Sequence, residues 1–139
     1  MKNLLIIFAL FLTLNVNAES TDVPLFYVVN EGKGFVTTLV GDETFTDPYN
    51  ECVPKRVILL YHDCTKTRPD SLVFLEESGY VTYNILNIFN EDNGSQTYEI
   101  LNKDGKGFVN LTIKDVNSTS IYVSYIRGDK QYTWSGVIN

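Results

Sequence analysis

Short segments rich in β-branched and aromatic residues recur along the chain, and polar or glycine-containing stretches separate them. Val, Ile, Thr, Tyr and Phe dominate these segments, and such residues favour strands. No stretch of useful length shows the apolar spacing of an amphipathic helix. The pattern therefore predicts about nine strands, at residues 25–29, 35–40, 57–61, 71–76, 80–89, 96–102, 107–113, 120–126 and 131–138.

Tight turns connect most of the predicted strands. Asp92-Asn93-Gly94 and Asp104-Gly105 are strong hairpin signals, because Asn-Gly and Asp-Gly readily adopt positive φ angles. Residues 30–34 are expected to form a turn, and residues 41–50 and 65–70 are expected to form loops. Sequential hairpins predict an all-β, antiparallel up-and-down meander of about eight to nine strands, closed into a small barrel without exposed edges. The alternative is a two-sheet β-sandwich.

The apolar run at residues 57–61 has no polar position, so it predicts a central strand covered on both faces. Cys52 and Cys64 flank this run. Two cysteines in an exported chain indicate one disulfide. A Cys52–Cys64 bridge requires flanks that curl back over a short strand, because the Cα atoms must approach within about 7 Å. Two separate thiols, or bridges to a second chain, are the alternatives.

Alternation assigns inner faces to the last strands. The expected inward residues are Val109, Leu111, Ile113, Ile121, Val123, Tyr125, Tyr132, Trp134 and Ile138. An aromatic-rich barrel interior can hold one small apolar or amphipathic ligand. The alternative is that the rings simply fill the core.

The first 18 residues predict a signal peptide that is removed. Lys2 precedes an apolar run at residues 4–14, and Val16 and Ala18 fit the small-residue cleavage rule. The run is too short to span a bilayer; a membrane anchor or a buried helix is the alternative reading. We expect residues 19–139 to form one secreted domain with its own core.

The formal net charge of the chain is −6. Such acidity argues against nucleic acid and anionic membranes as partners. Enzymatic activity is not expected, because the single histidine, His62, provides no metal cluster and the chain has no nucleophile elbow, phosphate loop or thiol redox pair. Glu76-Glu77 is expected to be a solvated corner, and neither a metal nor a cofactor is expected.

Two kinds of surface site are expected. Sequons for N-glycosylation begin at Asn93, Asn110 and Asn117, and all three amides are expected to point outward. Arg127-Gly128-Asp129, at a predicted hairpin tip, is the adhesion motif that integrins recognise. In that hypothesis Asp129 gives a carboxylate to a receptor metal and Arg127 reaches an acidic groove of this cell-surface receptor. The alternative is that Gly128-Asp129 is only a turn.

The leader, the compact meander and the sequons resemble secreted calycins, the lipocalin group. More narrowly, Phe45-Thr46-Asp47-Pro48-Tyr49-Asn50-Glu51-Cys52-Val53 is similar to the Asp-Pro…Cys-Val segment of tick salivary lipocalins. Those proteins capture small host mediators such as histamine, serotonin or lipids. The chain departs from the family because its only tryptophan is Trp134, so no Gly-x-Trp triplet lies near the first strand, and we carry over no ligand-contacting residues.

The resemblance implies a binder rather than an enzyme. The sequence therefore predicts a secreted protein that sequesters a small apolar or amphipathic molecule in a barrel interior. The alternative function is an extracellular interaction protein that binds integrins through Arg127, Gly128 and Asp129.

Overall fold

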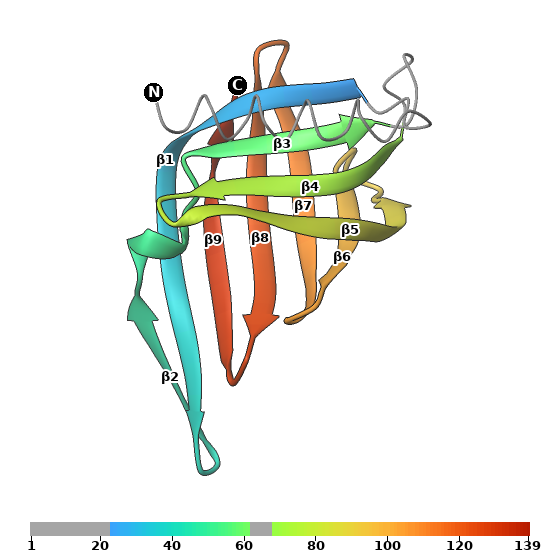
Figure 1. Ribbon diagram of the computed structural model, residues 1–139. Coiled ribbons are helices and arrows are strands. Elements are labelled where there is room, and N and C mark those ends of the chain that lie inside the picture. The colour runs from blue at the N-terminus through green and yellow to red at the C-terminus, as the bar shows by residue number, and fades with distance from the viewer. Residues whose placement is uncertain (1–22, 62–67) are drawn as a thin grey trace.

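The computed structural model describes residues 23–61 and 68–139. Within these residues the chain forms a single antiparallel sheet of nine strands and one short 3-10 helix (Figure 1). The elements are β1 (Val23–Val40), β2 (Glu43–Pro48), η1 (Asn50–Cys52), β3 (Arg56–Tyr61), β4 (Pro69–Glu76), β5 (Gly79–Asn90), β6 (Gln96–Asn102), β7 (Gly105–Asp115), β8 (Ser118–Arg127) and β9 (Lys130–Ile138).

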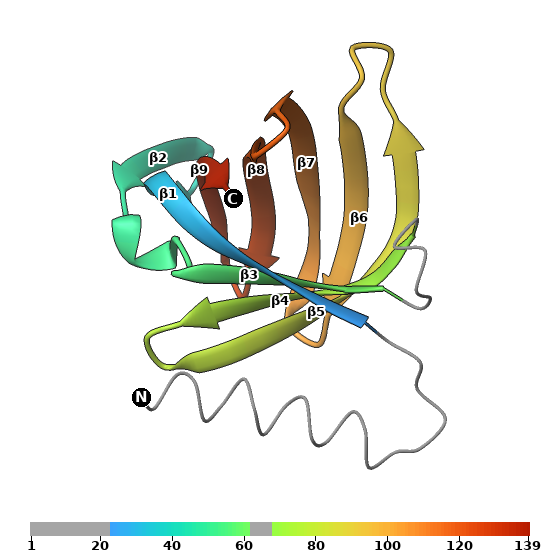
Figure 2. The ribbon, with the colours of Figure 1, turned by 90° about the horizontal axis from the view of Figure 1, so that it is seen from above.

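Strand β1 closes the sheet into a barrel because it pairs with strands from both ends of the meander. Its first part pairs with β3, where Tyr27 lies opposite Val57. Its second part pairs with β9, where Gly34 lies opposite Trp134. Strands β3 to β9 follow one another in chain order, so β1 and β3–β9 form a closed eight-stranded barrel (Figure 2). The predicted all-β meander and its closure are confirmed, and β2 is an additional strand.

The turn expected at residues 30–34 is wrong, because β1 continues through it. The pairing with β9 shifts register between Asn30 and Lys33, and Glu31 has a positive φ of 54°. Such a bulge bends a strand without ending it, and β1 curves strongly along its length in Figure 1. The bend lets one strand pair with β3 in one part and with β9 in the other.

The loop expected at residues 41–50 is also wrong, because it contains β2. Gly41, at a φ of 63°, reverses the chain, and the Thr37 and Thr46 hydroxyls hydrogen-bond across the hairpin at 2.9 Å. Every residue of β2 is exposed, and the β1–β2 hairpin projects beyond the barrel (Figure 1). A fully exposed strand lacks the alternation of burial that a sequence pattern detects.

Aromatic rings fill the middle of the barrel. The centroid of Phe74 lies 5.4 Å from that of Tyr83 and 5.5 Å from that of Trp134, and Tyr83 lies 5.7 Å from Tyr125. The inward positions predicted for β8 and β9 are buried or half-buried, whereas Ile113 is 72% exposed because it lies beside the β7–β8 hairpin at the barrel end. The interior is therefore packed at its centre, and cavities lie towards its two ends.

Strand β3 is buried throughout residues 57–61, which confirms the predicted central strand. One set of its side chains belongs to the barrel core. The alternate side chains, Ile58 and Leu60, form a second buried cluster with Val73 and Leu75 of β4. The described residues contain no helix of the length and apolarity that crossing a membrane requires.

Candidate functional site

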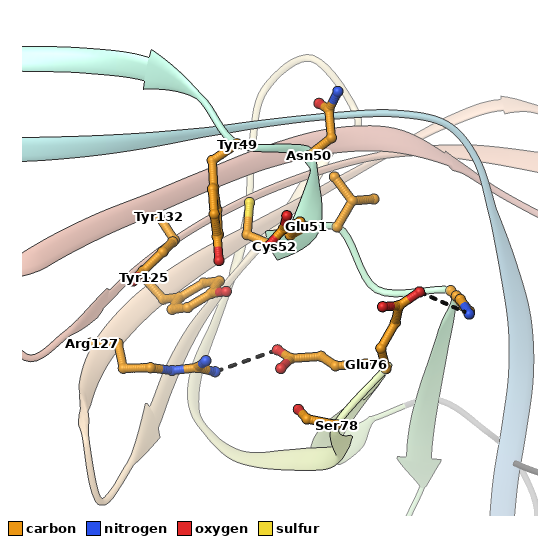
Figure 3. A pocket seen from close by; sticks show the side chains of 12 residues that line it. Tyr49, Asn50, Glu51, Cys52, Glu76, Ser78, Tyr125, Arg127 and Tyr132 are labelled. Atoms are coloured by element: carbon orange, nitrogen blue, oxygen red, sulfur yellow. Dashed lines mark hydrogen bonds and ion pairs between the residues drawn. The ribbon is translucent and has the colours of Figure 1, made fainter. Parts of the chain in front are cut away.

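An open pocket of about 620 Å³ lies at one end of the barrel, where η1 approaches the ends of β4 and β8 and the start of β9. Figure 3 shows its side chains, with Tyr125 and Tyr132 above Arg127, Glu76 across from Arg127, and Glu51 near Tyr49. We call it the arginine pocket, because Arg127 extends into it from the last position of β8.

Gly34 positions the η1 wall of the arginine pocket. Its amide donates to the Asn50 side-chain oxygen at 3.0 Å, and its carbonyl accepts from the Tyr49 amide at 2.8 Å. A Cβ atom at Gly34 would collide with the carbonyl oxygen of Tyr49 and the sulfur of Cys52. Glycine is required here because η1 packs directly against the β1 backbone.

Arg127 is held over two stacked rings. Its guanidinium carbon lies 5.4 Å from the ring centroid of Tyr125 and 5.9 Å from that of Tyr132, distances at which a cation is attracted to a ring face. The two rings are nearly parallel, at 21°, with centroids 5.5 Å apart. Tyr49 lies against Tyr132 at 5.9 Å. The guanidinium is therefore fixed in direction within an aromatic wall.

The guanidinium of Arg127 stays protonated in the pocket. Burial acts to lower its pKa, but the neighbouring Tyr83, Tyr125 and Glu76 raise the pKa overall. The Nη2 atom donates to Glu76 Oε1 at 3.4 Å. The Nε atom is buried and has no hydrogen-bond partner. Arg127 thus has one unused charged donor, which the surrounding side chains shield from solvent.

Glu76 and Glu77 behave differently, and the expected solvated corner is right only for Glu77. The Glu76 side chain is 14% exposed and pairs with Arg127, whereas the Glu77 side chain is 87% exposed and pairs with Lys55 at 3.3 Å. Glu76 is the last residue of β4, whereas Glu77 lies in the turn before β5, which explains the difference. Glu76 belongs to the pocket wall and was missed by the sequence analysis.

Glu51 adds a third carboxylate to the pocket. A side-chain hydrogen bond with Glu51, together with the charge of that carboxylate, raises the pKa of Tyr49. The lining therefore combines three acids with the two cations Lys55 and Arg127.

Cys52 has a buried, free thiol in the pocket wall. Its sulfur lies 3.8 Å from the carbonyl oxygen of Thr133, and burial raises the pKa of this thiol. The raised pKa keeps the sulfur protonated and unreactive near neutral pH. The predicted Cys52–Cys64 bridge is not formed in the structure, and Cys64 lies outside the described residues.

The integrin motif is divided by the fold. Gly128, at a φ of 66°, and Asp129 form the exposed β8–β9 turn, but the Arg127 side chain turns back into the arginine pocket (Figure 3). Integrin binding stays a prediction. It would require Arg127 to leave Glu76 and both tyrosine rings.

The three sequons differ in exposure. Asn93 and Asn117 are exposed turn residues, as expected. Asn110 is half-buried, and its amide nitrogen donates to Ser95 Oγ at 3.2 Å and to Thr97 Oγ1 at 3.0 Å. Both amide hydrogens therefore have acceptors within the protein, whereas an amide that points freely into solvent would have no such partners. The expected signal peptide at residues 1–18 and His62 lie outside the described residues.

Inward-facing positions could have revealed part of this site. Val123 and Tyr125 were expected to face inward, and the same alternation places Arg127 inward as well. Arg127 is also the first residue of the Arg127-Gly128-Asp129 motif, so the sequence predicted a surface role for it. The contact with Glu76 joins residues 51 positions apart, so no local pattern could have indicated it.

The described residues contain no group of three or more His, Cys, Asp or Glu side chains placed to hold a metal ion. The eight-stranded antiparallel barrel is consistent with a lipocalin-like fold. Comparison with known protein families, with curated proteins and with solved structures found no match for this chain. What this chain has in common with lipocalins is thus its barrel architecture, and the similarity to tick salivary lipocalins stays a resemblance.

Proposed function

We propose that this chain is a secreted, non-enzymatic binding protein that takes a small amphipathic molecule in the arginine pocket. One observation carries the proposal: Arg127 is fixed over Tyr125 and Tyr132 in an open pocket while its buried Nε has no partner. An unpaired buried donor is costly, by about 1–3 kcal/mol. A ligand oxygen that accepts from Nε would remove this penalty.

The rest of the pocket defines the other end of the ligand. Tyr49 and Tyr132 line the same pocket as the guanidinium, and a flat apolar group packs favourably against aromatic rings. Glu76 bonds Nη2 and leaves Nε free. An acceptor that bonds Nε would therefore leave the Glu76 pair in place, and it requires a turn of the guanidinium that exposes this buried atom to the pocket.

Three related probes test this chemistry. 3-Phenylpropionate and 3-phenylpropionamide both carry an acceptor oxygen on a flat apolar group, whereas phenethylamine replaces the acceptor with a cation. We expect calorimetry to detect the acid and the amide, and to show at least 10-fold weaker binding of the amine. Equal or tighter binding of the amine would contradict the proposed role of Arg127.

Variants locate the contact. Arg127→Gln should weaken binding at least 10-fold, because a hydrogen bond from a charged donor is worth about 1.5–3 kcal/mol. Arg127→Lys keeps the charge but lacks Nε, and should also bind weakly. Lys55→Gln removes a cation that is 58% exposed on the same rim, and should change affinity less than 2-fold. Unchanged affinity of both Arg127 variants would exclude this site.

A further inference from the structure

A second cavity lies at the opposite end of the barrel. It has a volume of about 330 Å³ and is bordered by the start of β1, the end of β3 and the β5–β6 and β7–β8 hairpins. This volume lies within the range of small-molecule sites. We call it the tyrosine pocket, because Tyr27, Tyr61 and Tyr98 all line it.

The three tyrosines converge from different strands. Tyr27 is on β1, Tyr61 on β3 and Tyr98 on β6. Burial, and then the neighbouring Tyr61 and Tyr27, raise the pKa of Tyr98, and all three side chains line the same cavity. The Tyr98 hydroxyl donates to Gln96 Oε1 at 2.9 Å. The hydroxyls of Tyr27 and Tyr61 have no hydrogen-bond partner among the described residues.

The remaining walls combine aliphatic side chains with polar ones, nearly all of them uncharged. Leu59, Leu111 and Ile138 provide aliphatic surface. Glu91, an exposed residue at the rim, is the one charged side chain among the described residues that line this cavity. The pocket therefore offers hydrogen-bond donors and apolar surface, but no cation that could neutralise an anion.

We propose that the tyrosine pocket is a second binding site, which takes a neutral, mainly aliphatic molecule bearing an acceptor oxygen such as a carbonyl. The hydroxyls of Tyr27 and Tyr61 donate to that oxygen, and Leu59, Leu111 and Ile138 enclose the alkyl part. An alkyl anion is disfavoured because its charge would lose water without gaining a counter-ion.

The two pockets are separate. No described residue lines both cavities. The rings of Phe74, Tyr83 and Trp134 lie between them in the barrel core. Ligand binding in one pocket can thus be measured without contributions from residues of the other. The proposal of a second site is therefore tested independently of ligand binding at Arg127.

Probes of equal chain length test the proposal with the purified full-length protein. 2-Decanone, decanoate and decylamine are titrated against bound N-phenyl-1-naphthylamine, a neutral fluorophore, at pH 8. We expect 2-decanone to bind at least 10-fold more tightly than either charged analogue. Tighter binding of decanoate or decylamine, or no binding of 2-decanone at 1 mM, would overturn the proposal.

Matched variants assign the site. Tyr27→Phe combined with Tyr61→Phe keeps both rings and removes both donors, and should weaken 2-decanone binding about 10-fold. Tyr132→Phe and Arg127→Gln change only the arginine pocket and should leave 2-decanone affinity unchanged. Leu111→Trp reduces the cavity and should abolish binding in protein whose circular dichroism is native. Loss of 2-decanone binding in Arg127→Gln but not in the double tyrosine variant would place the ligand elsewhere and refute the site.

Discussion

Arg127 Nη2 lies 3.4 Å from Glu76 Oε1 and connects the end of β8 to the end of β4 across the barrel mouth. The adjacent Glu77 forms its ion pair with Lys55 in solvent, where the two side chains are 87% and 58% exposed. The two neighbouring carboxylates therefore provide a matched comparison between a shielded and a solvated ion pair.

Glu76→Gln should lower the free energy of unfolding by about 1–2 kcal/mol, because it leaves the partly buried guanidinium without a counter-ion. Glu77→Gln should change it by less than about 0.5 kcal/mol, because exposed pairs contribute little. Urea denaturation of both variants checks this. Equal effects would show that the Arg127 pair is as weak as a surface pair.

Gly34→Ala should destabilise the chain by about 1–3 kcal/mol, the usual range for overpacking. The new methyl group would collide with the Tyr49 carbonyl and the Cys52 sulfur, and η1 would have to move. Adding Cys52→Ala should restore only part of the loss, since the Tyr49 backbone still obstructs the methyl group. Complete recovery in the double variant, measured by thermal unfolding, would mean that only the sulfur is in the way.

Buried tyrosines predict a loss of stability in alkaline solution. Burial raises the pKa of Tyr83, Tyr98 and Tyr125 above the ordinary value of 10.0. Their contribution is fully present below about pH 10, where the unfolded phenols are still neutral. It is lost as pH rises towards the higher folded pKa values, because the unfolded chain releases protons first. The free energy of unfolding should therefore fall above about pH 10.

Absorbance at 295 nm follows this titration directly. The phenolate signal of the buried tyrosines should appear only when the protein unfolds. Tyr98→Phe should reduce the amplitude of this signal. The same titration in urea provides the control, because every tyrosine is then solvated. A single native titration identical to that in urea would contradict the burial of these hydroxyls.

Glycan occupancy should differ among the sequons. Glycopeptide mapping of protein from a eukaryotic secretory host should find glycans on Asn93 and Asn117, which are exposed on hairpins beside the tyrosine pocket. Asn110 should be unmodified in the folded fraction, because a glycan would replace an amide hydrogen that Ser95 or Thr97 accepts. A native, fully occupied Asn110 would show that this network is dispensable.

Peptide mapping without reduction should recover Cys52 as a free thiol. Residues 56–61 of β3 extend about 17 Å, and Cys52 lies beyond the start of β3, beside Gly34. Three residues from Tyr61 to Cys64 reach only about 10 Å. Blocking with iodoacetamide in urea should therefore modify Cys52, whereas a Cys52–Cys64 peptide would mean that β3 is shorter in solution.

The parts of the fold that follow an alternating pattern could be predicted from sequence. Ile121, Val123 and Trp134 alternate with polar or exposed residues, and their burial was assigned correctly. The bulge near Glu31 was missed because glycine-rich segments resemble turns whether a strand ends or only bends. Strand β2 was missed because its stability comes from pairing with β1, not from burial.

The site was less predictable than the fold. The inward direction of Arg127 follows from alternation, but its partner Glu76 comes from β4. Other lining residues come from the segment after β2, and only barrel closure brings these parts together. The packed centre was also beyond sequence reasoning. Inward aromatic residues are compatible with a hollow barrel or a filled one, and only the ring distances of Phe74 and its neighbours decide between them.

The closing seam between β1 and β9 has a consequence for the order of events during synthesis. The Asn30 side chain donates to that of Asn139 at 2.7 Å, across 109 residues. The hairpins from β3 to β8 are local and can form as the chain emerges from the ribosome, but β1 must wait for β9 with half of its edge unpaired. Such distant pairing slows folding and exposes strand edges to other chains. A nascent chain stalled before residue 130 would therefore retain an open sheet.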